Sequence, residues 1–471
     1  MSRRPIIKLL GVALLLTASW ASAGTASPHY GIDITVDYDA GTFAGIVRLD
    51  FQNDTGGDLN ELFFRLYPNA TGIYGNATIR VDDAVVDETA VPIATYVDDT
   101  VLYVPLPEPL ADGDWIVVTI AFEGSADSWL GGTPATASSY GLLTRSERAM
   151  TLTAFYPLLA LHTEEGWVLD PVFEFGDALM SEASSYDVSL TIPEGLTPVT
   201  SGVLVDVVWA DGSPTYRYTI EAARDFSAVL VDGYEYQEAV IDGVTLRTWF
   251  TPANGRASDV TLERASAALT LFGDLIGPAP YDEIDYVEIP TQHAAGIEFS
   301  GLILISSGYA RDPEDVFYDI IVSHETAHQW FYAGVGNDIT EDPWLDESLA
   351  TYLSYVFLES TAPPAAASGT LDQWKRAYER AQASNPTLTI ASPLYAFSQS
   401  SAYGGFVYSG GAVFLHEVRQ AIGDEPFFAA LATYYLENRG LIASPTDLIC
   451  AFEASCDCQL TDLLVRFGLR P

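Results

Sequence analysis

The sequence predicts an α+β protein with an N-terminal all-β domain, a saddle or sandwich of strands, followed by a domain in which a mixed sheet precedes helices. From about residue 30 to residue 236, apolar and polar residues alternate, as in Ile32–Tyr38 and Ile116–Ile120, and turn-forming residues separate these runs. After residue 236, longer segments with helical periodicity replace the alternation. We therefore expect a β-sheet domain over residues 24–238 and a second domain over residues 239–471.

The first 23 residues have the form of a signal peptide. Arg3, Arg4 and Lys8 give a positive region. The apolar stretch Leu9–Leu16 follows, and Ala21–Ala23 offers a small-residue cleavage site. The arginine pair leaves both general secretory and twin-arginine export open. No later apolar run is long enough to span a bilayer, so we expect an exported protein, extracellular or periplasmic, without a stable membrane anchor.

The composition is strongly acidic. The chain has 21 Lys and Arg residues against 64 Asp and Glu residues, a formal net charge of −43. A surface of this charge repels polyanions, so we exclude nucleic acids and anionic membranes as partners. Two interpretations of the charge stay open: ordinary solubility, or adaptation to high salt, which screens the repulsion among the carboxylates.

All three cysteines, Cys450, Cys456 and Cys458, lie close to the C-terminus. An exported protein can form disulfides, and Cys450 could close a short loop with either of the other two, which leaves one thiol over. Their spacing is a poor match to known metal-ligand patterns, so a structural metal site at this place is not expected.

The second domain is organised around a predicted helix that contains His324 and His328. Asp312–Pro313 offers an N-cap followed by a proline at the first helical position, and Gly334 can end the helix. Apolar residues and both histidines recur between these points at helical spacing, which predicts that the histidines face inward. The stripe comprises Phe317, Ile320, Ile321, His324, His328 and Phe331.

The spacing of the two histidines indicates a metal site. Residues four apart lie one turn apart on one helix face, so His324 and His328 can each give a nitrogen to one zinc ion. Glu325 lies beside the first histidine, where it can reach a water on that metal. Glu347 follows His328 after eighteen intervening residues and is the natural third ligand, at the start of a second helix that Asp342–Pro343 can cap. A lone histidine on such a face is usually a core residue, but this combination favours a catalytic metal site.

Two other stretches could contribute to the site, although each is weak alone. Ala295–Phe299 contains Glu298 and stands just before a predicted strand at Leu302–Ile305. Val407–Gly411 contains Tyr408 and opens a later helix. A glutamate in a short strand is usually a solvated charge, and a tyrosine in a glycine-rich loop is usually a packing residue.

Taken in order, these motifs resemble the aminopeptidase N family of gluzincin zinc metallopeptidases, which has an exopeptidase motif, then the zinc motif, then a catalytic tyrosine. The resemblance implies a thermolysin-like catalytic domain and one zinc ion per chain, bound by His324, His328 and Glu347. It further implies these roles for the remaining residues: Glu325 is the general base, Tyr408 stabilises the tetrahedral intermediate, and Gly296 and Glu298 form the motif that binds the free α-amine of the substrate.

The sequence departs from the family pattern at several positions. Ala295, Ile297 and Phe299 replace the usual glycine, methionine and asparagine of the exopeptidase motif, and Ser409-Gly410 replaces Glu-Lys. A second amine-binding residue from the β domain is not placed, although Glu147 lies in about the right region. The chain ends near the expected end of the thermolysin-like domain, so we expect a short, two-domain member without the C-terminal helical domain and with a more open cleft.

These observations predict an exported zinc aminopeptidase that acts on peptides. A zinc endopeptidase that ignores the free amine is the first alternative, and a catalytically inactive binding protein on the same scaffold is the second. Asp346 and Thr351 are candidates for orienting the histidines. The preferred first residue, the natural substrate and the oligomeric state do not follow from the sequence.

Overall fold

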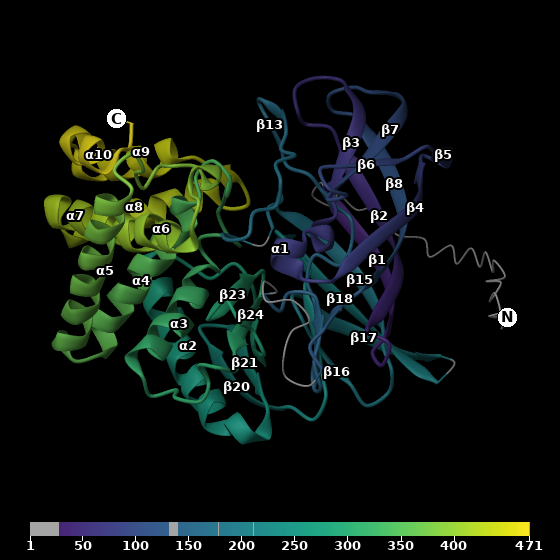
Figure 1. Ribbon diagram of the computed structural model, residues 1–471, viewed down its shortest axis with the longest axis horizontal. Helices are drawn as coiled ribbons and strands as arrows, with labels where there is room; N and C mark the ends of the chain where they lie inside the picture. Colours follow the sequence, from purple (N-terminus) through teal and green to yellow (C-terminus); the bar gives the residue numbers. More distant parts are fainter. Residues whose placement is uncertain (1–27, 131–139, 178, 211, 471) are drawn as a thin grey trace.

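The computed structural model describes residues 28–130, 140–177, 179–210 and 212–470, and it confirms the predicted α+β architecture. A β-rich N-terminal domain lies on one side of the molecule, and most helices gather on the other (Figure 1). A smaller sheet lies between them, beside helix α2 (Gly255–Leu275). The predicted signal peptide, residues 1–23, lies outside the described residues.

The largest sheet of the N-terminal domain has eight strands, with one parallel pair among antiparallel neighbours. On β1, Ile32, Ile34 and Val36 are buried and alternate with exposed residues, as the period-two pattern predicts. In sheet order the strands are β17 (Val203–Ala210), β18 (Ser213–Ala223), β15 (Ser184–Thr191), β1 (His29–Asp37), β2 (Thr42–Gln52), β8 (Trp115–Ser125), β4 (Thr78–Val86) and β5 (Thr89–Val91).

Smaller sheets and short helices complete this domain. One sheet has the order β16 (Thr197–Thr200), β19 (Ala228–Val231), β11 (Ala149–Leu152), β10 (Thr144–Arg145) and β9 (Asp127–Ser128). Another has the order β12 (Leu158–Leu159), β3 (Leu59–Arg65), β7 (Val101–Leu110) and β6 (Ala94–Tyr96). The remaining elements are a pair formed by β13 (His162–Thr163) and β14 (Gly166–Trp167), with η1 (Tyr67–Asn69) and α1 (Thr71–Tyr74).

The second domain begins with a five-stranded mixed sheet. Its order is β20 (Glu235–Ile241), β21 (Val244–Phe250), β22 (Glu283–Ile289), β24 (Leu302–Ser306) and β23 (Gly296–Phe299). β23 is the edge strand and runs antiparallel to β24. The predicted boundary at residue 238 falls inside β20, which pairs with β21, and the exact division of the chain stays a prediction.

Helices make up most of the chain after the sheet. In the part that the structure describes, none of the helices is both long enough and apolar enough to cross a membrane. They are α3 (Val316–Ala327), α4 (Trp344–Thr361), α5 (Pro364–Ser384), α6 (Ser400–Tyr403), α7 (Gly411–Ile422), α8 (Asp424–Asn438), α9 (Pro445–Cys456) and α10 (Thr461–Phe467). Minor elements are η2 (Pro252–Asn254), η3 (Leu394–Ala396), the π-helical turn η4 (Gly404–Gly410), β25 (Gly336–Asn337) and β26 (Ile442–Ala443).

The helix that contains the two histidines is shorter than its sequence pattern predicts. Asp315, not Asp312, is the N-cap, and its carboxylate accepts the backbone N–H of Phe317 at 2.8 Å. The predicted cap is wrong because Asp312 lies in a preceding turn, where its carbonyl accepts the N–H of Asp315 at 3.2 Å. The helix also ends at Ala327, well before Gly334, and tight turns follow. Similarly, α4 has Pro343 at its N-cap, so the side chain of Asp342 does not cap it.

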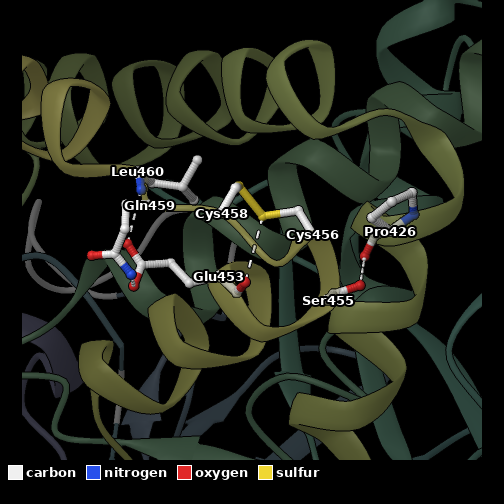
Figure 2. Close-up of a disulfide and its surroundings, with 7 residues drawn as sticks. All are labelled: Pro426, Glu453, Ser455, Cys456, Cys458, Gln459 and Leu460. Carbon is white, nitrogen blue, oxygen red and sulfur yellow. Dashed lines mark hydrogen bonds between the residues drawn. A yellow bond between two sulfur atoms is a disulfide. The ribbon is translucent and has the colours of Figure 1, made fainter.

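A disulfide joins Cys456 to Cys458 (Figure 2). Cys450 is free and exposed. The expectation that Cys450 closes a loop with one of the others is therefore wrong. α9 ends at Cys456, and Asp457 takes a left-handed conformation with φ 50°. This residue turns the chain back, so the two bonded cysteines have Cα atoms 5.2 Å apart.

Arg224 ties the two domains together from the interior. Its side chain is only 2% exposed and donates to three backbone carbonyls. The acceptors are Ser181 at 3.2 Å, in the N-terminal domain, and Tyr332 at 3.0 Å and Leu441 at 2.6 Å, in the second domain. The planar guanidinium suits this role because its donors point in several fixed directions at once.

The next residue, Asp225, also links the two domains, through hydrogen bonds that its carboxylate accepts. Its carboxylate accepts the hydroxyl of Tyr332 at 3.0 Å, the N–H of Ser300 at 3.1 Å and the hydroxyl of Ser227 at 2.9 Å. Burial raises the pKa of Asp225, while these hydrogen bonds oppose the rise. Tyr332 has φ 129°, a strained conformation that these contacts support just after the histidine helix.

We expect Arg224→Lys to lower the midpoint of thermal unfolding by several degrees, corresponding to roughly 2–4 kcal/mol. A lysine cannot reach three separated carbonyls, so buried acceptors lose their donors. Arg256→Lys is the matched control, because Arg256 forms an exposed ion pair with Glu314 and should change stability by less than about 0.5 kcal/mol. Equal midpoints for the two variants would show that Arg224 does not hold the domains together.

Candidate active site

The predicted site residues meet in a cavity of about 380 Å³. Both domains line it: residues 140–142 and 175–177 come from the N-terminal domain, and the other walls come mainly from β23, α3, α4 and η4. The predicted residues that line the cavity are Gly296, Glu298, His324, Glu325, Glu347 and Tyr408. His328 contacts this group from behind, at the C-terminal end of α3.

The three predicted metal ligands form a compact triangle of donor atoms. Nε2 of His324 lies 3.1 Å from Nε2 of His328. Oε2 of Glu347 lies 3.2 Å from the first nitrogen and 3.4 Å from the second. Glu347 reaches them because it lies in the first turn of α4, which packs against α3.

This donor set fits a zinc ion. Three donors about 2.0–2.1 Å from a tetrahedral zinc lie roughly 3.3 Å apart, which is the spacing found here. The Nδ1–H of His328 donates to the carbonyl of Phe331 at 2.9 Å, so its Nε2 carries the lone pair that a metal needs. Among the described residues, Oε2 of Glu347 has no hydrogen-bond donor, although it is buried. A cation among these atoms would satisfy all three.

The residues proposed to orient the histidines do not do so. Asp346 accepts hydrogen bonds from Asn337 at 3.2 Å and from the backbone of Glu347 at 2.9 Å. It therefore holds the start of α4 and not an imidazole. Thr351 lines the cavity, but among the described residues its hydroxyl has no hydrogen-bond partner. The group that does orient His328 is the backbone carbonyl of Phe331. It was not predicted, because a backbone carbonyl in a turn has no signal in the sequence.

Glu325 points into the cavity beside the metal donors. It is 5% exposed, and its Oε2 has no hydrogen-bond partner among the described residues. Gly296 makes this position possible, because a Cβ on Gly296 would lie 2.5 Å from Oε1 of Glu325. Carboxylate and imidazole atoms of Glu298, Glu325 and His328 all lie within 4.8 Å of one another.

Crowding of carboxylates in a buried place changes their acidity. Burial raises the pKa of Glu325 to about 8; the nearby His328 opposes the rise and Glu347 adds to it. Burial likewise raises the pKa of Glu298 to about 8, again against the influence of His328. For Glu347, burial alone would raise the pKa, but contacts with His324 and His328 lower it well below its usual range. Glu347 is thus held as an anion among the donor atoms, whereas burial favours the neutral form of the other two glutamates.

Tyr408 faces the same donors from η4. Its hydroxyl donates to Oε1 of Glu347, and its ring stacks on His324 with centroids 5.9 Å apart. Ser348 fixes the turn by donating its hydroxyl to the carbonyl of Val407 at 2.8 Å. At Gly411 a side chain would collide with Ser348, so glycine allows η4 and α4 to approach this closely.

The apolar stripe on the histidine helix borders both the cavity and the core, because Ile321 lines the cavity and is also buried in the core of the domain. Phe317 is 46% exposed and lines the cavity with Ile320 and Ile321. The prediction that the stripe packs inward is therefore wrong at Phe317 and confirmed at Ile321. A helix beside a cleft needs an apolar face toward substrate as well as toward the core, and periodicity does not distinguish the two.

The N-terminal domain contributes a carboxylate that sequence reasoning missed. Asp177 lines the cavity, whereas Glu147, the tentative candidate, lies exposed between β10 and β11, away from the cavity wall. Burial, and then Asp346, Glu347 and Glu298, raise the pKa of Asp177. Asp177 lies in a stretch without regular structure, so no periodicity marks it.

Comparisons with known proteins agree with this geometry. Residues 260–467 match the Peptidase family M1 domain. Aminopeptidase M1-A of Oryza sativa subsp. japonica is 23% identical over 454 residues, which cover 91% of this chain and 48% of that protein. Aminopeptidase N of Homo sapiens is 27% identical over 225 residues, which cover 44% of this chain and 23% of that protein. The chain thus spans about half the length or less of these curated relatives.

A solved structure matches almost the whole chain. An M1 zinc metallopeptidase from Deinococcus radiodurans superposes with a TM-score of 0.69 at 19% identity, covering 94% of this chain and 93% of that one. A mutant of that metallopeptidase has been crystallised with a Tyr-Ser-Ala substrate. At this identity the likeness establishes that the two chains share the two-domain fold.

Proposed function

Because the chain belongs to the aminopeptidase N family of M1 zinc metallopeptidases, we propose that it is an exported zinc aminopeptidase that removes the first residue of peptides. One observation carries the proposal: the carboxylate of Glu298 lies within 4.8 Å of Glu325 and His328, in the same cavity as the metal donors. A buried carboxyl group so close to the reacting centre is ionised by an ammonium that pairs with it, so it can hold the substrate's α-ammonium there.

The metal supplies electrostatic activation of a water molecule and of the scissile carbonyl when it is bound by His324, His328 and Glu347. The protein supplies the proton transfers. Glu325 accepts the proton of the attacking water and then donates it to the leaving amine, a cycle that suits a carboxylate with a pKa near neutrality. Family resemblance supports this role, and so does the position of Glu325 beside the donor triangle.

Tyr408 is proposed to stabilise the developing oxyanion. Its hydroxyl already points toward the metal donors, since it donates to Glu347. A short movement would bring it to a carbonyl oxygen beside those donors, where a preformed donor stabilises charge that develops in the transition state. The fixed turn at Ser348 and Gly411 keeps this hydroxyl near the metal site.

Glu298 is proposed to set the position of cleavage. It lies on the edge strand β23, so an extended substrate can pair with this strand while its α-ammonium contacts the carboxylate. The ammonium then fixes the first carbonyl over the metal donors. The Tyr-Ser-Ala substrate of the Deinococcus radiodurans neighbour supports a short peptide as the kind of substrate.

Export is part of the proposal and rests on the sequence of residues 1–23. The disulfide between Cys456 and Cys458 is consistent with an oxidising compartment. Expression of the full chain in a bacterial host should release a mature protein that begins at Gly24. Intact mass measurement of the exported fraction checks this; an uncleaved product confined to the cytosol would contradict it.

We expect Glu325→Gln to keep about one zinc per chain and to lose roughly 10²–10⁴ in kcat, because the metal ligands remain while the proton acceptor is gone. Zinc is measured by elemental analysis and the rate with an amino-acid amide. His324→Ala is the companion variant and should lose both metal and activity. A Glu325→Gln enzyme as fast as wild type would refute the assignment of the base.

The role of Glu298 separates an aminopeptidase from an endopeptidase. We expect Glu298→Ala to lower kcat/KM for amino-acid amides by roughly tenfold or more, because one charge-assisted contact to the ammonium is lost. Wild type should shorten a peptide stepwise from its free N-terminus and leave the N-acetylated twin intact, as read by mass spectrometry. Internal cleavage of both peptides at similar rates would replace the aminopeptidase proposal by the endopeptidase alternative.

A further inference from the structure

The two edges of the eight-stranded sheet in the N-terminal domain differ in length. At one edge, β5 has only three residues, which leaves little backbone for another strand to pair with. At the other edge, β17 has eight residues, and among the described strands it pairs with β18 alone. A long edge strand presents a row of backbone N–H and C=O groups that can bind a further strand. β17 is therefore the open edge of this sheet.

The side chains of β17 are apolar and lie outside the core. Seven of its eight residues are exposed, and β18 is the last strand at this end that buries residues in the core. Val205 is 65% exposed and Trp209 is 60% exposed. The other large apolar residues of the strand, each between 37% and 47% exposed, are Val203, Leu204 and Val208. Contiguous apolar surface of this kind marks an interaction site on soluble proteins.

The charge of β17 limits which partner fits this edge. Asp206 is the one charged residue of the strand, and Arg217 of β18 lies 3.8 Å away and offsets it. Neither an acidic nor a basic partner strand would gain a charge contact on β17, whereas an apolar strand would cover its side chains. The occupant that fits is therefore an apolar strand, and β17 of a second copy of this chain is such a strand.

A second β17 also fits this edge by symmetry. Two identical edge strands related by a two-fold axis pair antiparallel and join their sheets. The register of β17 against β18 shifts between Leu204 and Asp206, so the regular part of the edge begins at Asp206. An axis centred on Val207 places Asp206 opposite Val208 of the second copy, so the two acids do not face one another.

The position and size of the edge suit a weak dimer. Figure 1 shows β17 at the border of the N-terminal domain, away from the helices around the cavity, so pairing there leaves the cavity uncovered. The large exposed side chains of β17 and its backbone bury on the order of 500 Å² from each copy, which is near the lower limit of about 1,000 Å² in total for a specific interface.

The net charge makes association of two copies depend on salt. The formal net charge is −43, so two copies repel each other at low ionic strength. Salt shortens the screening length from about 10 Å at 0.1 M to about 3 Å at 1 M, which weakens the repulsion while the apolar contact remains. Association of two copies thus strengthens with salt, whereas binding of a cationic partner would weaken.

We propose that β17 is the interface of a two-fold dimer in which two copies of this chain join their eight-stranded sheets edge to edge. The dimer forms mainly at high ionic strength. It does not depend on the proposed aminopeptidase function, because the interface lies away from the cavity.

Sedimentation equilibrium of the purified, zinc-loaded protein tests the proposal. The dissociation constant of the dimer should fall at least about tenfold between about 0.1 M and about 1 M NaCl. Val205→Glu adds an acid to each edge and should raise that constant at least about tenfold. A protein that is monomeric at every concentration and salt would overturn the proposal, and so would a dimer that weakens with salt or that Val205→Glu leaves unchanged.

Val240→Glu is the matched control. Val240 is 64% exposed on β20, which is an edge strand of the five-stranded sheet, so the variant adds the same charge at a different edge. It should leave the dissociation constant unchanged, and both variants should unfold at the temperature of wild type. Equal weakening by the two variants would overturn the proposal, because net charge and not β17 would then set the association.

Asp206→Ala should act in the opposite direction. The carboxylate of Asp206 accepts the N–H of Val207 at 2.8 Å, so this variant frees a donor of the edge strand and removes its one charge. The dissociation constant should fall by roughly threefold or more. A weaker dimer in Asp206→Ala would contradict pairing through this edge.

Chemical cross-linking locates the contact directly. Val208→Cys in a Cys450→Ser background places a thiol near the two-fold axis and removes the free, exposed thiol. A short bis-maleimide added at about 1 M NaCl should join two copies through this cysteine. Val240→Cys in the same background should stay monomeric on a denaturing gel. Cross-linking at Val240 alone, or at neither position, would overturn the proposal.

Discussion

The contact between three metal-binding side chains is the constraint on which the second domain depends. The donor atoms of His324, His328 and Glu347 lie within 3.4 Å of one another, so a metal ion or shared protons must lie among their lone pairs. Two helices must therefore hold a fixed distance and rotation, and the approach of α4 to η4 through Ser348 serves this requirement. Packing of the domain is arranged around a site that is complete only with its metal.

The N-terminal domain is as much a part of the site as the helices are. It forms one wall of the cavity, and Arg224 and Asp225 hold it in place through buried hydrogen bonds to turns of the second domain. One of these turns, at Tyr332, directly follows the histidine helix. Because the same contacts join the domains and brace the metal helix, the cavity wall and the metal donors are positioned together.

Residues whose signal is local were predictable, and residues whose position depends on tertiary structure were not. The placement of His324 and His328 follows from helix geometry, Glu347 lies at a chain spacing known for zinc peptidases, and the structure brings these three together. Helix ends were less certain, because Asp312 and Asp315 are both good caps and only the turn before α3 selects between them. Asp177 could not be found, because it meets the metal helices only through the docking of two domains. The pairing of Cys456 with Cys458 was not predicted, because it depends on the left-handed backbone conformation of Asp457, which no sequence pattern marks.

The edge position of β23 has a consequence for which chain ends this cleft can accept. A strand at a sheet edge recognises a partner through backbone N–H and C=O groups that have no other bonds. An N-terminus inside a stable helix or sheet has already committed those groups, and releasing them costs free energy for every residue that is peeled away. If the proposed aminopeptidase function holds, the cleft should discriminate by the structure of the substrate's N-terminus. Under that proposal, unfolded tails and short peptides are the expected substrates, and N-termini inside stable folds are not.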